Sequence, residues 1–167
     1  MTICKSFTLP DFSEQSVRAC ASALAGLART GDVIALSGDL GAGKTVFAKA
    51  FVRALTNEDE DVPSPTFTLV QIYDGRRGNE GLTIWHFDLY RLKSAEEIYE
   101  TGFEEALSDG VSLIEWPERA GNLLPRDRLT VHLEAPAGRP DKRNITITAN
   151  GTDWIQRMEN IKECLNV

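Results

Sequence analysis

The sequence predicts an α/β fold with three layers, in which helices cover a mixed, partly antiparallel central sheet. Three observations support this prediction. An apolar run of strand length at residues 33–36 leads into a glycine-rich loop, and residues 45–55 then repeat apolar side chains at helical spacing. Several later segments alternate apolar and polar residues with the period of two that strands require. At 167 residues, the chain suits one domain, residues 1–167.

The first third of the chain contains a strand, a helix and the strand that leads into the loop. Residues 4–9 are expected to form a short edge strand, because Pro10 stops it. Asp11, with Glu14 three residues later, resembles a capping box for a helix whose C-cap we place at Gly31. The apolar face of this helix consists of Val17, Ala21, Leu24 and Leu27.

The remaining segments supply the other strands and the last helices. Residues 68–73 and 82–90 predict an antiparallel hairpin around a glycine-rich turn. Ser94 and Glu97 form a second capping box, which opens a helix. Three more strands and a closing amphipathic helix follow, at residues 110–114, 129–134, 144–148 and 154–165.

The charge and the cysteines limit the possible partners and compartment. A net charge of −7 argues against a large basic nucleic-acid surface, so no DNA contact and at most an indirect tRNA contact are expected. The three cysteines are widely spaced and odd in number, which indicates reduced thiols in a cytoplasmic protein. No long apolar segment predicts a signal peptide or a membrane span.

Residues 38–45, Gly38-Asp-Leu-Gly-Ala-Gly-Lys-Thr45, form a glycine loop that matches the pattern G-x-x-x-x-G-K-[ST]. Its glycines let successive amides turn toward one anion, at a helix N-terminus whose dipole favours negative charge. Lys44 supplies a mobile charge for the β and γ phosphates, and the Thr45 hydroxyl can ligate Mg²⁺. The loop therefore predicts a P-loop NTPase-like fold that binds a nucleoside triphosphate. The predicted contacts are the loop and the residue after it: Gly38, Asp39, Leu40, Gly41, Ala42, Gly43, Lys44, Thr45 and Val46.

Two acidic residues that end apolar segments are candidates for holding the metal of a bound nucleotide. Glu115 ends the strand at residues 110–114 and is the first choice for Mg²⁺. Asp88 shares a strand face with His86, and we expect it either to orient the attacking water or to complete the outer shell of the metal. A helix cap or a loop anchor also explains either acid. His86 fits a structural histidine as well as a catalytic base.

The segment Ser64-Pro-Thr-Phe67 lies where nucleotide switches place a sensor of the γ-phosphate. The Thr66 hydroxyl is a candidate ligand of phosphate or Mg²⁺, and with Lys44 and Asp88 it completes the predicted catalytic set. A proline turn before a strand explains the segment equally well on spacing alone. Trp116 fits a core position, and its place beside Glu115 makes contact with the nucleotide or a partner a second hypothesis.

Four blocks together resemble the TsaE family, also called YjeE, of bacterial tRNA threonylcarbamoyladenosine biosynthesis. They are the glycine loop, Ser64-Pro-Thr-Phe-Thr-Leu-Val70, His86-Phe-Asp-Leu-Tyr-Arg-Leu92 and Glu115-Trp-Pro117. The resemblance implies an Mg²⁺-dependent ATPase, weak alone, that supports a TsaB–TsaD complex without performing the threonylcarbamoyl transfer to adenosine 37 of tRNA. It extends from the first strand to roughly Arg139, nearly the whole chain.

The resemblance also implies roles for single residues. It assigns Lys44 to phosphate, Thr45 and Glu115 to Mg²⁺, and Asp88 to hydrolysis, and it places Trp116 near the nucleotide. Two further nucleotide contacts are carried from the family, Ser13 (or Asp11) near the start of the first helix and Arg139 after the late strand. Relatives often have a second Thr where this chain has Val46, and little consequence is expected because Thr45 fills the metal position.

Two alternatives share the phosphate chemistry. A small-molecule or nucleoside kinase would need an arginine-bearing lid, for which Arg126 and Arg128 are the candidates. A nucleotide-dependent binding module would hydrolyse ATP negligibly alone and act by changing its affinity for a partner. A GTPase is disfavoured because the chain contains no N-K-x-D segment.

Overall fold

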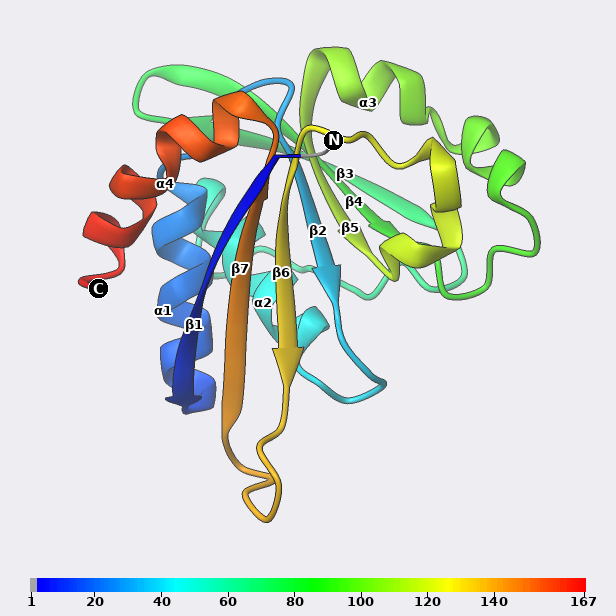
Figure 1. Ribbon diagram of the computed structural model, residues 1–167. Helices are drawn as coiled ribbons and strands as arrows, with labels where there is room; N and C mark the ends of the chain where they lie inside the picture. The colour runs from blue at the N-terminus through cyan, green and yellow to red at the C-terminus, as the bar shows by residue number, and fades with distance from the viewer. Residues whose placement is uncertain (1–2) are drawn as a thin grey trace.

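The computed structural model describes residues 3–167 of the chain (Figure 1). The strands are β1 (Cys4–Phe12), β2 (Val33–Ser37), β3 (Val70–Arg77), β4 (Glu80–Asp88), β5 (Gly110–Glu115), β6 (Arg128–Glu134) and β7 (Arg143–Asn150). The α-helices are α1 (Glu14–Ala25), α2 (Lys44–Leu55), α3 (Phe103–Asp109) and α4 (Thr152–Cys164), and the 3₁₀ helices are η1 (Ala95–Thr101) and η2 (Pro117–Leu123).

All seven strands form one mixed sheet in the order β1-β7-β6-β2-β5-β4-β3. The central strands β6, β2, β5 and β4 are parallel, so their carboxyl ends meet at one edge. The β3–β4 hairpin on one side, and β7 with β1 on the other, add antiparallel strands to this parallel centre. The predicted mixed α/β fold is confirmed, and the edge where the parallel strands end is where α/β proteins place their sites.

Helices pack on both faces of the sheet and enclose two hydrophobic clusters (Figure 1). The larger cluster joins α1, α2 and α4 to one face through residues such as Phe47, Phe51 and Trp154. The smaller one joins η1, α3 and η2 to the other face over β4 and β5, around Phe87 and Phe103. Burial on both faces explains why β2 and β5 are mostly apolar, with Ser112 as a buried polar residue within β5.

The predicted start of the first helix is wrong by two residues. The N-cap is Ser13, whose side chain accepts a hydrogen bond from the Ser16 amide at 3.1 Å, whereas Asp11 lies inside β1. The strand continues past Pro10 because the register shifts between Leu9 and Phe12, and such an irregularity tolerates a proline. The same helix ends earlier than predicted, with its C-cap at Gly26.

A buried ion pair ties the last helix to the sheet. Arg157 of α4 donates to both carboxylate oxygens of Asp32, at 2.8 and 2.9 Å, and also to the carbonyl of Leu27. Although burial opposes the charged form, the hydrogen bonds from Arg157 to Asp32 raise the pKa of Arg157 overall. Asp32 precedes β2, so this contact fixes α4 against the strand that leads into the glycine loop.

Asp32→Ala is expected to lower the free energy of unfolding by about 2–3 kcal/mol, because Arg157 would keep a buried charge with only part of its partners. Chemical denaturation measures the change. Asp153→Ala is the matched control, since Asp153 also contacts Arg157, at 3.3 Å, but is 62% exposed. It should cost less than about 1 kcal/mol. Equal losses in the two variants would contradict a special role for the buried pair.

Candidate functional site

A pocket of about 370 Å³ opens at the edge where the parallel strands end. It lies between the glycine loop, the segment before β3 and the ends of β4 and β5. It contains most of the predicted site residues, although Gly38 and Asp39 do not line it. The lining consists of Leu40, Gly41, Ala42, Gly43, Lys44, Thr45, Val46, Ser64, Thr66, Asp88, Tyr90, Arg91, Glu115 and Trp116.

The glycine loop needs glycine for geometric reasons. Gly38 has a φ of +139°, and a Cβ atom there would lie 2.3 Å from the carbonyl oxygen of Leu133. Gly43, the N-cap of α2, has a φ of +106°. Within residues 3–167, no side chain caps the first amides of this helix, so they stay available to an anion.

Arg143, at the start of β7, holds the loop from outside. Its Nε donates to the carbonyl of Ala42 at 2.8 Å, and its Nη2 donates to that of Gly41 at 3.1 Å. By satisfying two carbonyls, this side chain stabilises a backbone whose amides can face inward. Sequence reasoning missed Arg143, and no local signal marks it because it lies about a hundred residues from the loop.

Lys44, near the end of the glycine loop, is buried. Its ammonium group donates to the carbonyl oxygens of Gly38 and Asp39 and lies 4.0 Å from the centre of the Trp116 ring. Burial lowers the pKa of Lys44 below its ordinary value, against the opposing effect of nearby carboxylates, with Glu115 the foremost of these. An incoming polyphosphate would offer this desolvated charge far stronger acceptors than two carbonyls.

Thr45 and Glu115 meet directly, as the sequence hypothesis requires. The Thr45 hydroxyl donates to Glu115 Oε1 at 3.0 Å, and the other carboxylate oxygen lies 2.7 Å from Nε2 of His86. Glu115 is buried at the end of β5, next to Asp88 in the strand register. A hydroxyl and a carboxylate at this distance match the few protein ligands that Mg²⁺ accepts when phosphate oxygens and water complete its shell.

Asp88 lies beside the switch-like segment and not against Thr45. Its Oδ2 accepts hydrogen bonds from Thr66 at 3.0 Å and Ser64 at 3.4 Å, while Oδ1 accepts the amide of Tyr90 at 3.0 Å. The side chain is therefore fixed at the wall of the pocket. Thr66 contacts Asp88 in this structure, so the segment before β3 and the acid form one hydrogen-bonded unit.

Aromatic side chains border the pocket. Trp116 adopts a left-handed backbone conformation with φ of +57°, which ends β5 and turns the chain into η2. Its ring lies 4.8 Å from that of Tyr90. Phe67 is 82% exposed, and the guanidinium of Arg91 lies 4.5 Å from its ring. The hypothesis that Trp116 stands near a bound nucleotide is consistent with its place over Lys44.

The two nucleotide contacts that the family resemblance implies outside the glycine loop, Ser13 and Arg139, lie outside this pocket. Ser13 uses its hydroxyl to cap α1, and Arg139 forms an ion pair with Asp11 at 2.6 Å on the surface. Neither lines the pocket around Lys44. Their assignment to the nucleotide stays a prediction.

Within residues 3–167, no group of three or more His, Cys, Asp or Glu side chains is arranged to hold a metal ion alone. A metal at Thr45 and Glu115 would therefore depend on ligands from a bound molecule, as Mg²⁺ in nucleotide sites does. In the same part of the chain, none of the helices has both the length and the apolar composition to cross a membrane.

The fold and this pocket define the class: an α/β protein with a glycine loop, a buried lysine and a carboxylate at neighbouring strand ends. A family model described as "Threonylcarbamoyl adenosine biosynthesis protein TsaE" matches residues 12–145, and the chain belongs to the TsaE family.

Individual relatives agree with the family model. The TsaE protein of Rickettsia conorii is 46% identical over 74% of this chain and 68% of its own length, and that of Bacillus subtilis is 36% identical over 92% of both. The crystal structure of Bacillus subtilis YdiB is similar with a TM-score of 0.71, at 30% identity, over 98% of this chain and 97% of that one.

Proposed function

We propose that this protein binds ATP with Mg²⁺ and hydrolyses it. The observation that carries the proposal is the contact between Thr45 and Glu115 beside the buried Lys44, at the N-terminus of a helix whose first amides no side chain of residues 3–167 caps. Desolvated positive charge, oriented amides and a hydroxyl–carboxylate pair are the three parts that a site for a metal-bound polyphosphate needs.

A second pocket, of about 310 Å³, could hold the nucleoside part of the nucleotide. It adjoins the other side of the glycine loop and shares Gly41, Gly43 and Val46 with the first pocket. Its remaining lining comes from α1 and from the segment before β7, and includes Glu14, Val17 and Asp141. A nucleotide across the loop would place its phosphates at Lys44 and its base and sugar here. The preference for ATP over GTP rests on the missing N-K-x-D segment.

The pocket residues would have different roles in hydrolysis. Lys44 and the loop amides neutralise the charge that develops on the phosphates, and Thr45 and Glu115 would hold the metal. If Mg²⁺ is bound by Thr45 and Glu115, it would supply positive charge that offsets the negative charge of the phosphates. Asp88 faces the pocket with its orientation fixed by Thr66, Ser64 and the Tyr90 amide, so it can orient a water for attack on the γ-phosphate.

The cellular role that we propose follows the family. The relatives are described as tRNA threonylcarbamoyladenosine biosynthesis proteins. By this membership, the ATPase supports a TsaB–TsaD complex in the cytoplasm, which carries out threonylcarbamoylation of tRNA. Contact with tRNA would then be indirect, as the net charge of −7 favours.

Lys44→Ala is expected to weaken ATP binding by about 10–100-fold, since charge-assisted hydrogen bonds contribute about 1.5–3 kcal/mol. Calorimetric titration measures the affinity. Lys49→Ala is the matched control, because it removes the same charge from the same helix but lies outside the phosphate pocket. An affinity of Lys44→Ala equal to that of the parent would overturn the proposed site.

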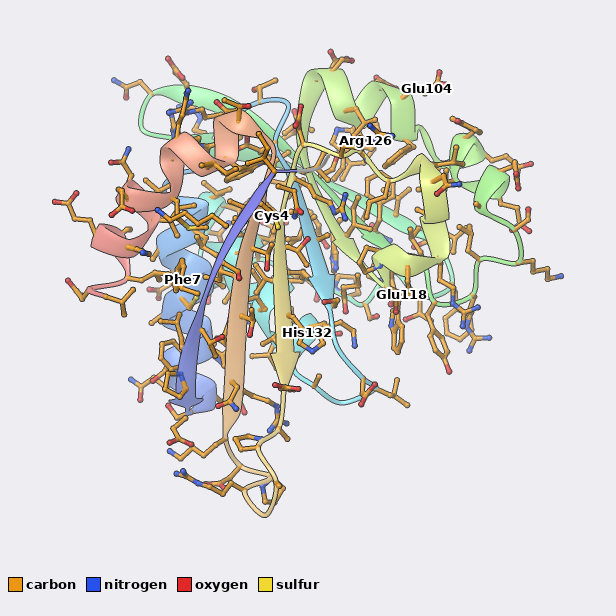
Figure 2. All side chains as sticks on the ribbon, in the orientation of Figure 1. Cys4, Phe7, Glu104, Glu118, Arg126 and His132 are labelled. Atoms are coloured by element: carbon orange, nitrogen blue, oxygen red, sulfur yellow. The ribbon has the colours of Figure 1, made fainter. Side chains whose placement is uncertain are left out.

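A kinase finds little support in the placement of its candidate lid. Arg128 starts β6 and Arg126 precedes it, so both lie at the amino end of the parallel strands, away from the pocket (Figure 2). Figure 2 shows Arg126 near the start of β6, whereas Glu118 and His132 lie toward the opposite end. Transfer of phosphate from ATP to an added nucleoside, instead of to water, would favour the kinase.

A further inference from the structure

His86 is a buried histidine with a single polar contact. It lies on β4, is 0% exposed, and its Nε2 is 2.7 Å from Glu115 Oε2. Its other ring nitrogen, Nδ1, is buried and has no hydrogen-bond partner among residues 3–167. A histidine that served only to connect parts of the core would be expected to use both nitrogens. This one is directed at a single carboxylate.

The contact fits the imidazole tautomer that carries its proton on Nε2. In that form Nε2–H donates to Glu115, and the unpartnered Nδ1 is only an acceptor. Glu115 thus gains a fixed hydrogen-bond donor on the side away from the pocket.

The two carboxylate oxygens of Glu115 have different hydrogen-bond partners. Oε2 is held by His86 from within the core, and Oε1 accepts the Thr45 hydroxyl at the pocket. The order Thr45–Glu115–His86 runs from α2 through β5 to β4, so three separate elements fix one carboxylate. A free glutamate side chain could rotate about its last bond, and a donor on Oε2 restricts that rotation.

We infer that His86 is a positioning residue for the metal: by holding Oε2, it presents Oε1 of Glu115 to Mg²⁺. This inference rests on the proposed function, because it concerns the same metal. His86 itself touches neither nucleotide nor metal, since it is enclosed in the sheet and does not line the pocket. Its loss should weaken the metal's contribution to binding without changing how the loop holds phosphate.

Two variants of similar size separate positioning from packing. In His86→Gln, the amide nitrogen stands as many bonds from the backbone as Nε2 and can donate to Glu115. In His86→Met, the side chain has similar length and no donor. For the parent and each variant, calorimetry measures ATP affinity in Mg²⁺ and in EDTA. The ratio of the two affinities reports the coupling between nucleotide and metal.

The expected result is that His86→Met reduces this ratio by about 10–100-fold, the usual cost of losing a partner behind a metal ligand. Its affinity in EDTA should equal that of the parent. His86→Gln should keep most of the coupling. If the Met variant does not fold, His86→Asn replaces it, because its amide ends at the Nδ1 position and does not reach Glu115.

The experiment distinguishes a failure of the proposed function from a failure of the inference about His86. A parent protein that shows no ATP binding, or no effect of Mg²⁺ on it, contradicts the proposed function itself. A parent with clear coupling, together with a Gln variant and a Met (or Asn) variant that keep it equally or lose it equally, leaves that function intact and overturns the role of His86.

Discussion

Glu115→Gln is expected to lower the rate of Mg²⁺-dependent ATP hydrolysis by about 100–1,000-fold, the range seen when one preorganised electrostatic contact to a transition state is lost. The substitution keeps the shape of the side chain and removes the charge that would hold the metal, although the one remaining oxygen can accept from only one of Thr45 and His86. ATP affinity in EDTA should stay the same or increase, because phosphate would no longer meet a nearby negative charge. Single-turnover hydrolysis and calorimetry measure the two effects.

Glu118→Gln is the control for this variant. Glu118 also raises the pKa of Lys44 through its charge, but it is exposed at the start of η2 (Figure 2) and does not line the pocket. Its removal changes the local charge as much as Glu115→Gln does and should leave hydrolysis nearly unchanged. A Glu115→Gln protein as active as the Glu118→Gln protein would remove Glu115 from the metal site.

Asp88→Asn is expected to lower hydrolysis by about 100-fold or more, the contribution of a positioned acid–base group, while ATP affinity stays near that of the parent. The amide retains an acceptor oxygen for Thr66 or the Tyr90 amide, but it binds an attacking water less strongly than a carboxylate does. Comparing turnover with binding distinguishes a loss in the chemical step from a loss of site structure.

Asp74→Asn provides the matched comparison, since Asp74 is an exposed acid on the neighbouring strand β3. Its hydrolysis rate should equal that of the parent. An Asp88→Asn protein that binds and hydrolyses ATP like this control would show that Asp88 only anchors the segment before β3, the structural reading that the sequence left open.

Local patterns were sufficient to predict the centre of the site. The glycine loop is contiguous, and the strand predicted before it at residues 33–36 and the helix predicted after it at residues 45–55 are both present in the structure. Glu115 could be identified because an apolar strand ends there and Trp116-Pro117 cannot continue it. A residue at the carboxyl end of a parallel strand is brought to the loop by topology alone.

Contacts between distant segments were beyond the reach of such patterns. Arg143 reaches the glycine loop from β7, and Arg157 reaches Asp32 from the last helix, and in neither case does spacing in the sequence indicate the partner. The role of His86 depended on which carboxylate faces it across β4 and β5. The misplaced helix start had a different cause: pairing with β7 kept Asp11 in a strand, so tertiary context overrode a local capping signal.

A crystal structure with Mg²⁺ and a non-hydrolysable ATP analogue tests the central claim most directly. The account predicts the β and γ phosphates inside residues 38–45, with Lys44 bonded to them in place of the Gly38 and Asp39 carbonyls. The metal should lie about 2.1 Å from the Thr45 hydroxyl, with Glu115 binding it directly or through water. A nucleotide bound elsewhere, or a metal remote from both Thr45 and Glu115, would contradict the account.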